Sequence, residues 1–211
     1  MINYSEKSLV NIEREHVLSE MTYLSKRYSA VNFIETGTHL GEAVLFMAKY
    51  GSFNNIHSIE ISDYFIKFIN DNFEKVANNE KIDVSNVKIW KGDSVEVLPS
   101  LVSTLPGRSL FWLDAHFSGG DTNKSDSYDC TILKELEIIK SSPTKDHIIV
   151  IDDMDCCHNS SSDYPKISEI SELILSINKD YLITIKYNVL FAEVPQASMK
   201  LSYSRNVYRN T

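Results

Sequence analysis

The sequence predicts an α/β protein of one domain, built on a mostly parallel sheet that a C-terminal antiparallel hairpin closes. Short apolar runs alternate five times with segments of helical periodicity, which is typical of parallel strands joined by crossover helices. The last part, 181–194, instead contains two strand-like runs separated by a tight turn near Asn188. Five crossover strands and one hairpin give a seven-stranded, doubly wound sheet with helices on both faces.

The first half of the chain contains three of the strand–helix units. Residues 5–28 repeat apolar side chains at helical spacing, so we expect an amphipathic helix that packs on the domain or on a second copy of the chain. A buried strand then leads through a glycine turn, Gly37 to Gly41, into a helix that Gly51 is placed to end. The strands of this half are expected at 31–35, 56–60 and 87–90, with helices at 41–50, after Ser62 and after residue 94.

The second half continues the pattern with two longer polar loops. A near-continuous apolar run at 109–114 predicts a strand buried on both faces, and a polar segment at 116–129 follows it. A helix at 131–141, a strand at 147–153, a second polar loop and a helix at about 166–179 precede the hairpin. We therefore expect an N-terminal helical segment (1–30), a core (31–195) and a tail (196–211).

Composition excludes several classes of protein. Of the 211 residues 43% are hydrophobic and 24% charged, which is typical of a soluble globular domain. The formal net charge of −8 disfavours nucleic acid and anionic membranes as partners. We find no apolar run long enough to span a bilayer and no apolar signal-peptide core. With only three cysteines, we expect reduced thiols and a cytoplasmic protein.

Acidic residues stand at the end of every predicted parallel strand. The carboxyl ends of such strands meet at one edge of the sheet, where ligands bind. One acid there would be explained as a helix cap, but clustered carboxylates cost free energy unless something binds them. Five strand ends with acids therefore favour a ligand site. The acids are Glu35, Glu60, Asp93, Asp114 and the pair Asp152 and Asp153.

The glycine turn points to a cofactor without phosphates. It differs from the dinucleotide pattern G-x-G-x-x-G, because Thr38 and His39 fill part of the turn and leave less room for a pyrophosphate. Glu35 precedes the turn, where a carboxylate would attract a cation. An acidic rather than glycine-rich surrounding fits a cationic ligand.

With these motifs the chain resembles the class I S-adenosylmethionine-dependent methyltransferases over about residues 30 to 190. ETGTHLG matches the family's acidic-x-Gly-x-x-x-Gly motif, Glu60 matches the acid that binds the ribose hydroxyls, and Asp93 with Ser94 matches the position that holds adenine. The resemblance implies a Rossmann-like fold and S-adenosyl-L-methionine as cofactor. The cofactor-binding residues that it implies are Glu35, Thr36, Gly37, Thr38, Gly41, Glu60, Ile61, Asp93, Ser94 and Asp114.

More narrowly, the chain is similar to the metal-dependent O-methyltransferases, such as catechol O-methyltransferase and the macrolide-sugar enzymes. Asp114, Asp152 and Asp153 match the metal-binding acids of that branch by position, although the pair is Asp-Asp where catechol O-methyltransferase has Asp-Asn. Three carboxylates suit Mg²⁺ or another divalent ion, which would orient an acceptor hydroxyl and lower its pKa. His116 is then the candidate general base. The alternative is that Asp152 or Asp153 caps the next segment, that Asp114 only faces the cofactor, and that His116 is a solvated or structural loop residue.

The leading hypothesis is O-methylation of a small polar acceptor, such as a sugar of a surface polysaccharide or a secondary metabolite. The loop 117–128 would be a lid over the site and Tyr164 a stacking surface, and the helix at 5–28 would join a homodimer. One alternative is an NAD-dependent oxidoreductase or nucleotide-sugar enzyme, which the missing G-x-G-x-x-G and Tyr-x-x-x-Lys patterns disfavour. The other is a non-catalytic binding module, which would have no reason to keep clustered like charges.

Overall fold

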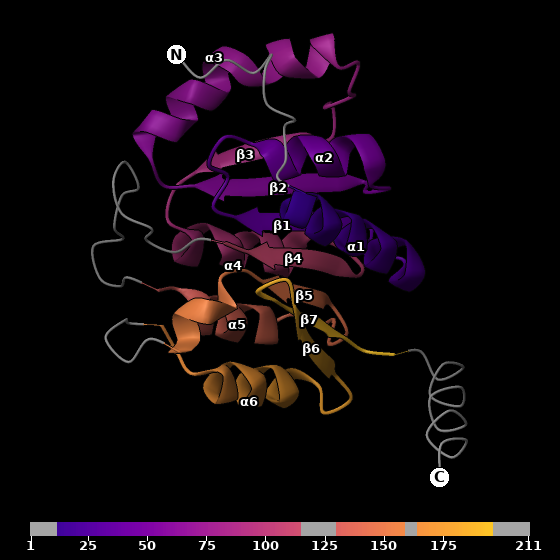
Figure 1. The fold of residues 1–211 in the computed structure, drawn as a ribbon, viewed down its shortest axis with the longest axis vertical. Helices are drawn as coiled ribbons and strands as arrows, with labels where there is room; N and C mark the ends of the chain where they lie inside the picture. Colours follow the sequence, from indigo (N-terminus) through magenta and orange to yellow (C-terminus); the bar gives the residue numbers. More distant parts are fainter. Residues whose placement is uncertain (1–11, 115–129, 159–163, 196–211) are drawn as a thin grey trace.

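The computed structural model describes residues 12–114, 130–158 and 164–195, which form a seven-stranded sheet between two layers of helices (Figure 1). The strand order is β3-β2-β1-β4-β5-β7-β6, and Figure 1 shows it from top to bottom. The elements are α1 (Ile12–Tyr28), β1 (Asn32–Thr36), α2 (Glu42–Tyr50), β2 (Asn55–Glu60), α3 (Asp63–Asn79), β3 (Val87–Lys91), α4 (Ser94–Thr104), β4 (Ser109–Leu113), α5 (Ile132–Lys140), β5 (Ile148–Ile151), a 3₁₀ turn (Met154–His158), α6 (Ile167–Ile177), β6 (Leu182–Lys186) and β7 (Val189–Glu193).

Strand β1 is the centre of the parallel part of the sheet. It pairs with β2 on one side and β4 on the other, and its five residues are all buried. From β1 the chain first builds outward through β2 and β3, and then returns to add β4 and β5 on the opposite side. This reversal makes a switch point beside the carboxyl end of β1, where sheets of this kind bind ligands. The predicted α/β fold, with its parallel sheet and closing hairpin, is confirmed.

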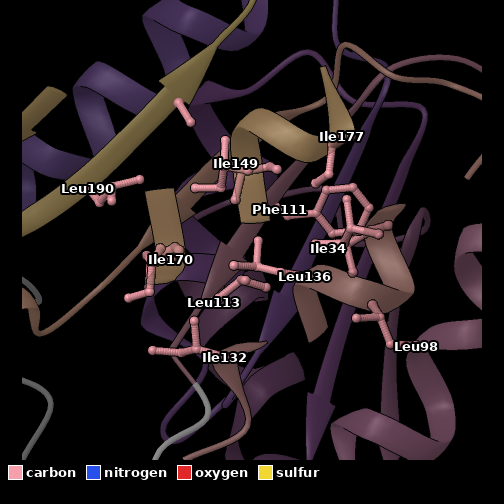
Figure 2. Close-up of a cluster of buried hydrophobic side chains, with 14 of the residues drawn as sticks. Ile34, Leu98, Phe111, Leu113, Ile132, Leu136, Ile149, Ile170, Ile177 and Leu190 are labelled. Atoms are coloured by element: carbon pink, nitrogen blue, oxygen red, sulfur yellow. The ribbon is translucent and has the colours of Figure 1, made fainter. Parts of the chain in front are cut away.

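Two apolar clusters cover the two faces of the sheet. Side chains alternate between faces along a strand, so Phe33 faces α1 and α2 while Ile34 faces α4, α5 and α6. Figure 2 shows the second cluster, in which sheet residues such as Phe111 and Ile149 lie against helix residues such as Leu136. The helices therefore cover both faces, and only the edges of the sheet are left for a ligand.

Helix α1 packs on the domain itself. Val17, Leu18 and Met21 are buried in the cluster that includes Phe33 and Phe191, so the predicted apolar face is used within the chain. This contact removes the basis for a homodimer through that face. Residues 5–11 of the predicted helix lie outside the described residues.

The closing hairpin turns through two residues, Tyr187 and Asn188, with φ of 55° and 61°. Two consecutive residues with positive φ between antiparallel strands form a type I′ turn, whose twist matches that of the strands, and Asn adopts positive φ readily. The Asn188 side chain accepts a hydrogen bond from the Asp155 backbone N–H at 2.6 Å and donates to the Asp155 carboxylate at 2.7 Å. The hairpin turn therefore holds the segment that follows β5.

His147, just before β5, is a buried structural residue. Its Nδ1 accepts a hydrogen bond from the Ser109 N–H at 3.0 Å, and its Nε2 lies 2.9 Å from the Ser142 hydroxyl. Because Nδ1 is the acceptor, the proton of the neutral ring is on Nε2. Burial lowers the pKa of His147 to about 4; Asp146 opposes this shift, and Arg108 and Lys145 add to it.

Some predicted boundaries are wrong by one to two residues. Strands β4 and β5 end at Leu113 and Ile151, so Asp114 and the Asp152–Asp153 pair follow the strands instead of ending them. Trp90 of β3 is only half-buried, and its Nε1–H donates to His57 Nδ1 at 3.1 Å. Across the described part of the chain, no helix is long and apolar enough to cross a membrane.

Candidate active site

Backbone hydrogen bonds align the carboxyl ends of five adjacent strands. Each residue just past a strand donates its N–H to the end of the neighbouring strand. Gly92 donates to Glu60 O, Gly37 to Ile59 O, Asp114 to Thr36 O, and Asp152 to Leu113 O, at 2.9 to 3.1 Å. We call this row the carboxyl edge. It brings the acids that follow the strands to one side of the sheet, as the sequence predicts.

The glycine turn folds over the end of β2. Gly37, His39 and Gly41 have positive φ values of 89°, 49° and 80°, a conformation that glycine adopts without strain and other residues seldom do. The N–H groups of Gly37 and Thr38 both point to Ile59 O, and that of Gly41 points to Thr38 O at 2.8 Å. An added Cβ on Gly41 would lie 3.2 Å from the Phe73 ring, so the turn also packs tightly against α3.

Glu60 ties the glycine turn to the end of β2. Its Oε2 accepts the His39 N–H at 2.8 Å and its Oε1 accepts the Ser62 N–H at 2.7 Å, while only 5% of the residue is exposed. Each carboxylate oxygen can accept more than one hydrogen bond, so both retain acceptor capacity for a hydroxyl donor. The structure thus holds the Glu60 carboxylate rigidly where the sequence predicts a ribose diol.

Glu35 does not present a charge to the site. It is 1% exposed and accepts a hydrogen bond from the Ser58 hydroxyl, which in turn lies 2.6 Å from the Thr38 hydroxyl. Burial raises the pKa of Glu35 to about 8, although Ser58 and Arg14 partly offset the shift. Its carboxyl is therefore neutral at pH 7, and the predicted attraction between an ionised Glu35 and a cationic cofactor is not supported by this geometry.

Asp93 caps α4, and the residue after it faces a buried acid. The Asp93 Oδ1 accepts the Val95 N–H at 2.9 Å, which is the helix-cap alternative considered for a single acid. Ser94 lies near Glu135 of α5, whose carboxyl is completely buried. Neither Glu135 oxygen has a hydrogen bond of ordinary geometry within the described chain. Burial raises the pKa of Glu135 to about 7, and the hydroxyls of Ser94, Thr131 and Thr36 partly offset it.

Arg14 of α1 bridges the acids that follow β4 and β5. Its Nη2 donates to Asp114 Oδ2 at 3.0 Å and its Nη1 to Asp152 Oδ2 at 3.1 Å. The guanidinium carbon also lies 5.4 Å from the centre of the Trp112 ring. Burial lowers the pKa of Arg14, but the charges of Asp114 and Asp152 raise it by more. A permanent positive charge therefore stands between the two predicted metal ligands.

Asp153 is set apart from this bridge. Its backbone has a φ of 54°, and its N–H donates to Asp152 Oδ1 at 2.9 Å. Its charge adds to burial in raising the pKa of Cys156 and Tyr164. No three His, Cys, Asp or Glu side chains among residues 12–114, 130–158 and 164–195 are grouped to hold a metal ion. The predicted metal set of Asp114, Asp152 and Asp153 is not assembled in this arrangement.

The predicted lid and base fall outside the described residues. His116 and the loop 117–128 belong to the segment 115–129. Tyr164, the predicted stacking surface, is half-buried and packs against the cluster under α5 and α6. Part of its side chain therefore packs against the core, and only the remainder is exposed.

Comparison with solved structures establishes the fold. An O-methyltransferase from Bacillus cereus, solved with SAH, aligns at a TM-score of 0.59 and 15% identity over 88% of this chain and 82% of that one. The O-methyltransferase TomG from Streptomyces achromogenes, involved in tomaymycin synthesis and solved with SAM, gives 0.57 and 14% over 86% and 80%. The SAH-bound methyltransferase PaMTH1 from Podospora anserina gives 0.55 and 14% over 92% and 83%. The fold is that of the class I methyltransferases. No protein-family model and no curated protein matches the sequence.

On this methyltransferase fold, the predicted site residues divide into two groups at the carboxyl edge. One group surrounds the glycine turn and the ends of β2 and β3, where Glu60 contacts the turn directly. The other follows β4 and β5, where Asp114 and Asp152 share Arg14. The sequence placed the acids of both groups at the ends of the strands, but it did not reveal which contacts each carboxylate makes.

Two residues of the site were missed in the sequence, and both carry a recognisable signal. Arg14 precedes Leu18 and Met21 by four and seven residues, so a charge is in line with the apolar stripe of α1. Glu135 has the same feature, since it lies three residues after Ile132 and four before Ile139, and both of these are buried. A charged residue in the apolar stripe of a helix indicates a buried polar contact.

Proposed function

We propose that the protein is an S-adenosylmethionine-dependent methyltransferase that acts on an oxygen of a small polar acceptor. The observation that carries this proposal is the contact between Glu60 and the glycine turn at the switch point of the sheet. It fixes a carboxylate where a ribose diol can donate two hydrogen bonds to it. The shared fold with SAM- and SAH-bound O-methyltransferases supports the same cofactor.

The hydrogen bonds of the glycine turn favour this cofactor over NAD. A dinucleotide site directs the N–H groups of its glycine turn at a pyrophosphate. Here the N–H groups of Gly37, Thr38 and Gly41 donate to carbonyl oxygens, and that of His39 donates to Glu60. The turn therefore has few donors left for phosphate, and an oxidoreductase is the weaker candidate.

In the proposed reaction the chain binds the cofactor, holds the acceptor and removes the acceptor's proton. When bound, the cofactor supplies a methyl group activated by its sulfonium, so that a C–O bond forms as the C–S bond breaks. Glu60 and Asp93 bind the nucleoside part, and the glycine turn, with Thr36 before it, lies beside the methionine part. We assign removal of the acceptor proton to His116, and to Asp114 the role of holding the acceptor next to it.

The acceptor that best suits the site is a polyol or another polar molecule. Beyond β4 and β5 lie the carboxylates of Asp114 and Asp152, and between them the guanidinium of Arg14 from α1. These groups pair well with hydroxyls and poorly with a flat apolar ring. A sugar of a surface polysaccharide or a secondary metabolite fits this chemistry. A cytoplasmic location, predicted from the composition, is part of the proposal.

A divalent ion at this edge stays a prediction. Carboxylate oxygens suit Mg²⁺, but the Oδ2 atoms of Asp114 and Asp152 are both directed at Arg14. A metal ion in the predicted place would require Arg14 to release both carboxylates. The residues in their present arrangement therefore do not fit the ion, and no step of the proposed reaction depends on it.

Calorimetry with S-adenosylhomocysteine and with NAD tests the proposal. We expect the full chain to bind S-adenosylhomocysteine and to show no comparable binding of NAD. Methyl transfer from labelled S-adenosylmethionine to a panel of sugars and phenols would then identify the acceptor class. Tight NAD binding without S-adenosylhomocysteine binding would refute the proposed function.

A further inference from the structure

The guanidinium of Arg14 stands where a divalent ion is expected in a metal-dependent O-methyltransferase. Each of its two terminal nitrogens donates a hydrogen bond to one carboxylate, so Arg14 links the residues that follow β4 and β5 as a bridging metal ion would. Its side chain is 34% exposed, whereas those of Asp114 and Asp152 are 16% and 13% exposed. Arg14 is therefore the member of this cluster most accessible to a small molecule.

Helix α1 places this charge firmly. Leu18 and Met21, one and two turns further along, are fully buried in the apolar cluster beneath the helix. The guanidinium also lies over the Trp112 ring, an attraction that adds to the two ion pairs. The position of Arg14 thus follows from the packing of the whole helix, and does not depend on the two carboxylates alone.

The charges allow one cation at this place. A guanidinium and a divalent ion, both within contact distance of the same two oxygens, would repel each other strongly in a partly buried site. A metal ion also needs the carboxylate oxygens to converge on one point at about 2.0–2.6 Å. The Oδ2 atoms of Asp114 and Asp152 instead face two different nitrogens of Arg14.

We propose that Arg14 is the resident cation of the carboxyl edge, and that it keeps divalent ions off Asp114 and Asp152 and binds the acceptor oxygen in their stead. The second part rests on the proposed function. A guanidinium has five N–H donors, and the two carboxylates use one on each terminal nitrogen, so others remain for an acceptor hydroxyl. A cation beside that hydroxyl favours its ionised form and so lowers its pKa, which is what a bound metal ion would do.

The positive charge of Arg14 also reaches the glycine turn. Burial lowers the pKa of His39 and Arg14 lowers it further, and Arg14 likewise opposes the burial that raises the pKa of Glu42. The same guanidinium is thus close enough to act at both groups of the site.

Manganese binding tests the first part without any assumption about activity. Free Mn²⁺ is measured by electron paramagnetic resonance for the full chain as wild type, Arg14→Gln, Arg14→Lys and Arg27→Gln. Arg27 is the matched control, since it lies on the last turn of α1 and contacts Tyr23. We expect Arg14→Gln to bind Mn²⁺ at least about tenfold more tightly than the other three, because only this change removes the competing charge from the carboxylates.

The gain should vanish when Asp152→Asn is added to Arg14→Gln. Equal Mn²⁺ binding by wild type and Arg14→Gln would overturn the proposal. Should Arg14→Gln fail to fold, wild type decides the question. A wild-type Mn²⁺ site that Asp152→Asn abolishes refutes the proposal, and the absence of such a site supports it.

Kinetics test the second part once an acceptor is known. We expect Arg14→Gln to raise the KM for the acceptor while leaving the Kd for S-adenosylhomocysteine within about twofold, because Arg14 pairs with Asp114 and Asp152, whereas Glu60 accepts its hydrogen bonds from His39 and Ser62. Wild-type activity should resist EDTA. An unchanged acceptor KM, or loss of wild-type activity in EDTA, would overturn this part. Failure of wild type to bind S-adenosylhomocysteine would instead refute the proposed function and leave the Mn²⁺ result intact.

Discussion

Replacing Glu60 by Gln should weaken cofactor binding without unfolding the protein. The carboxylate accepts the His39 N–H at 2.8 Å and the Ser62 N–H at 2.7 Å, and a Gln amide can accept only on one side. One backbone N–H then faces an NH₂ group, which should lower the free energy of unfolding by about 1–3 kcal/mol. Loss of the charged acceptor for the ribose should cost binding about 1.5–3 kcal/mol, or roughly 10- to 100-fold in Kd.

The two effects are measured separately. Calorimetry with S-adenosylhomocysteine gives the Kd, and urea denaturation of the unliganded chain gives the free energy of unfolding. Asp63→Asn is the matched control, because its carboxylate is 90% exposed and pairs with Lys91 on the surface at 2.9 Å. Such a pair contributes about 0–1 kcal/mol, so both quantities should stay near wild type. A folded Glu60→Gln variant with the wild-type Kd would refute the ribose role.

Three further changes test the packing around the site. His147 has a pKa of about 4 in the folded protein, below its unfolded value, so the free energy of unfolding should fall by about 3 kcal/mol as pH drops from 6.5 to 4. Urea denaturation at several pH values should show this fall in wild type and not in His147→Gln. Glu135 has a pKa of about 7 in the folded protein, above its unfolded value. Its contribution to the free energy of unfolding is therefore complete below pH 4.5 and is lost as pH rises to 7. Glu135→Gln should therefore be the more stable protein at pH 8 by about 3 kcal/mol, and equal stability would contradict its burial as a charged group. Gly41→Ala should lower the denaturation midpoint through a loss of about 1–2 kcal/mol, because φ is +80° and the new Cβ would meet the Phe73 ring; an unchanged midpoint would contradict this strain.

Local patterns predicted the elements because each rule acts over a few residues. The buried run at 109–114 and the helical stripe of α6 were visible in the sequence, and both elements lie where they were expected to within three residues. The ends of β4 and β5 were placed too late, since an acid after an apolar run does not reveal where hydrogen bonding stops. Nor does the strand-like run at 87–90 reveal that β3 is the edge strand beside β2 and is only partly buried.

By itself the sequence determined the α/β fold, the glycine turn and the acids at the ends of the strands, because these depend on periodicity, glycine and position along the chain. Only the tertiary structure decided the state and partner of each acid. Glu35 becomes neutral through burial, Asp93 caps a helix, and Asp114 is held by Arg14, which is 100 residues away in the chain. A carboxylate's charge and ligand are set by the groups that packing brings against it. The position of Arg14 in the apolar stripe of α1 indicates a buried polar contact, but it does not name Asp114 and Asp152 as the partners. The sequence placed the acids at one edge of the sheet, and the packing of α1 brought Arg14 against two of them.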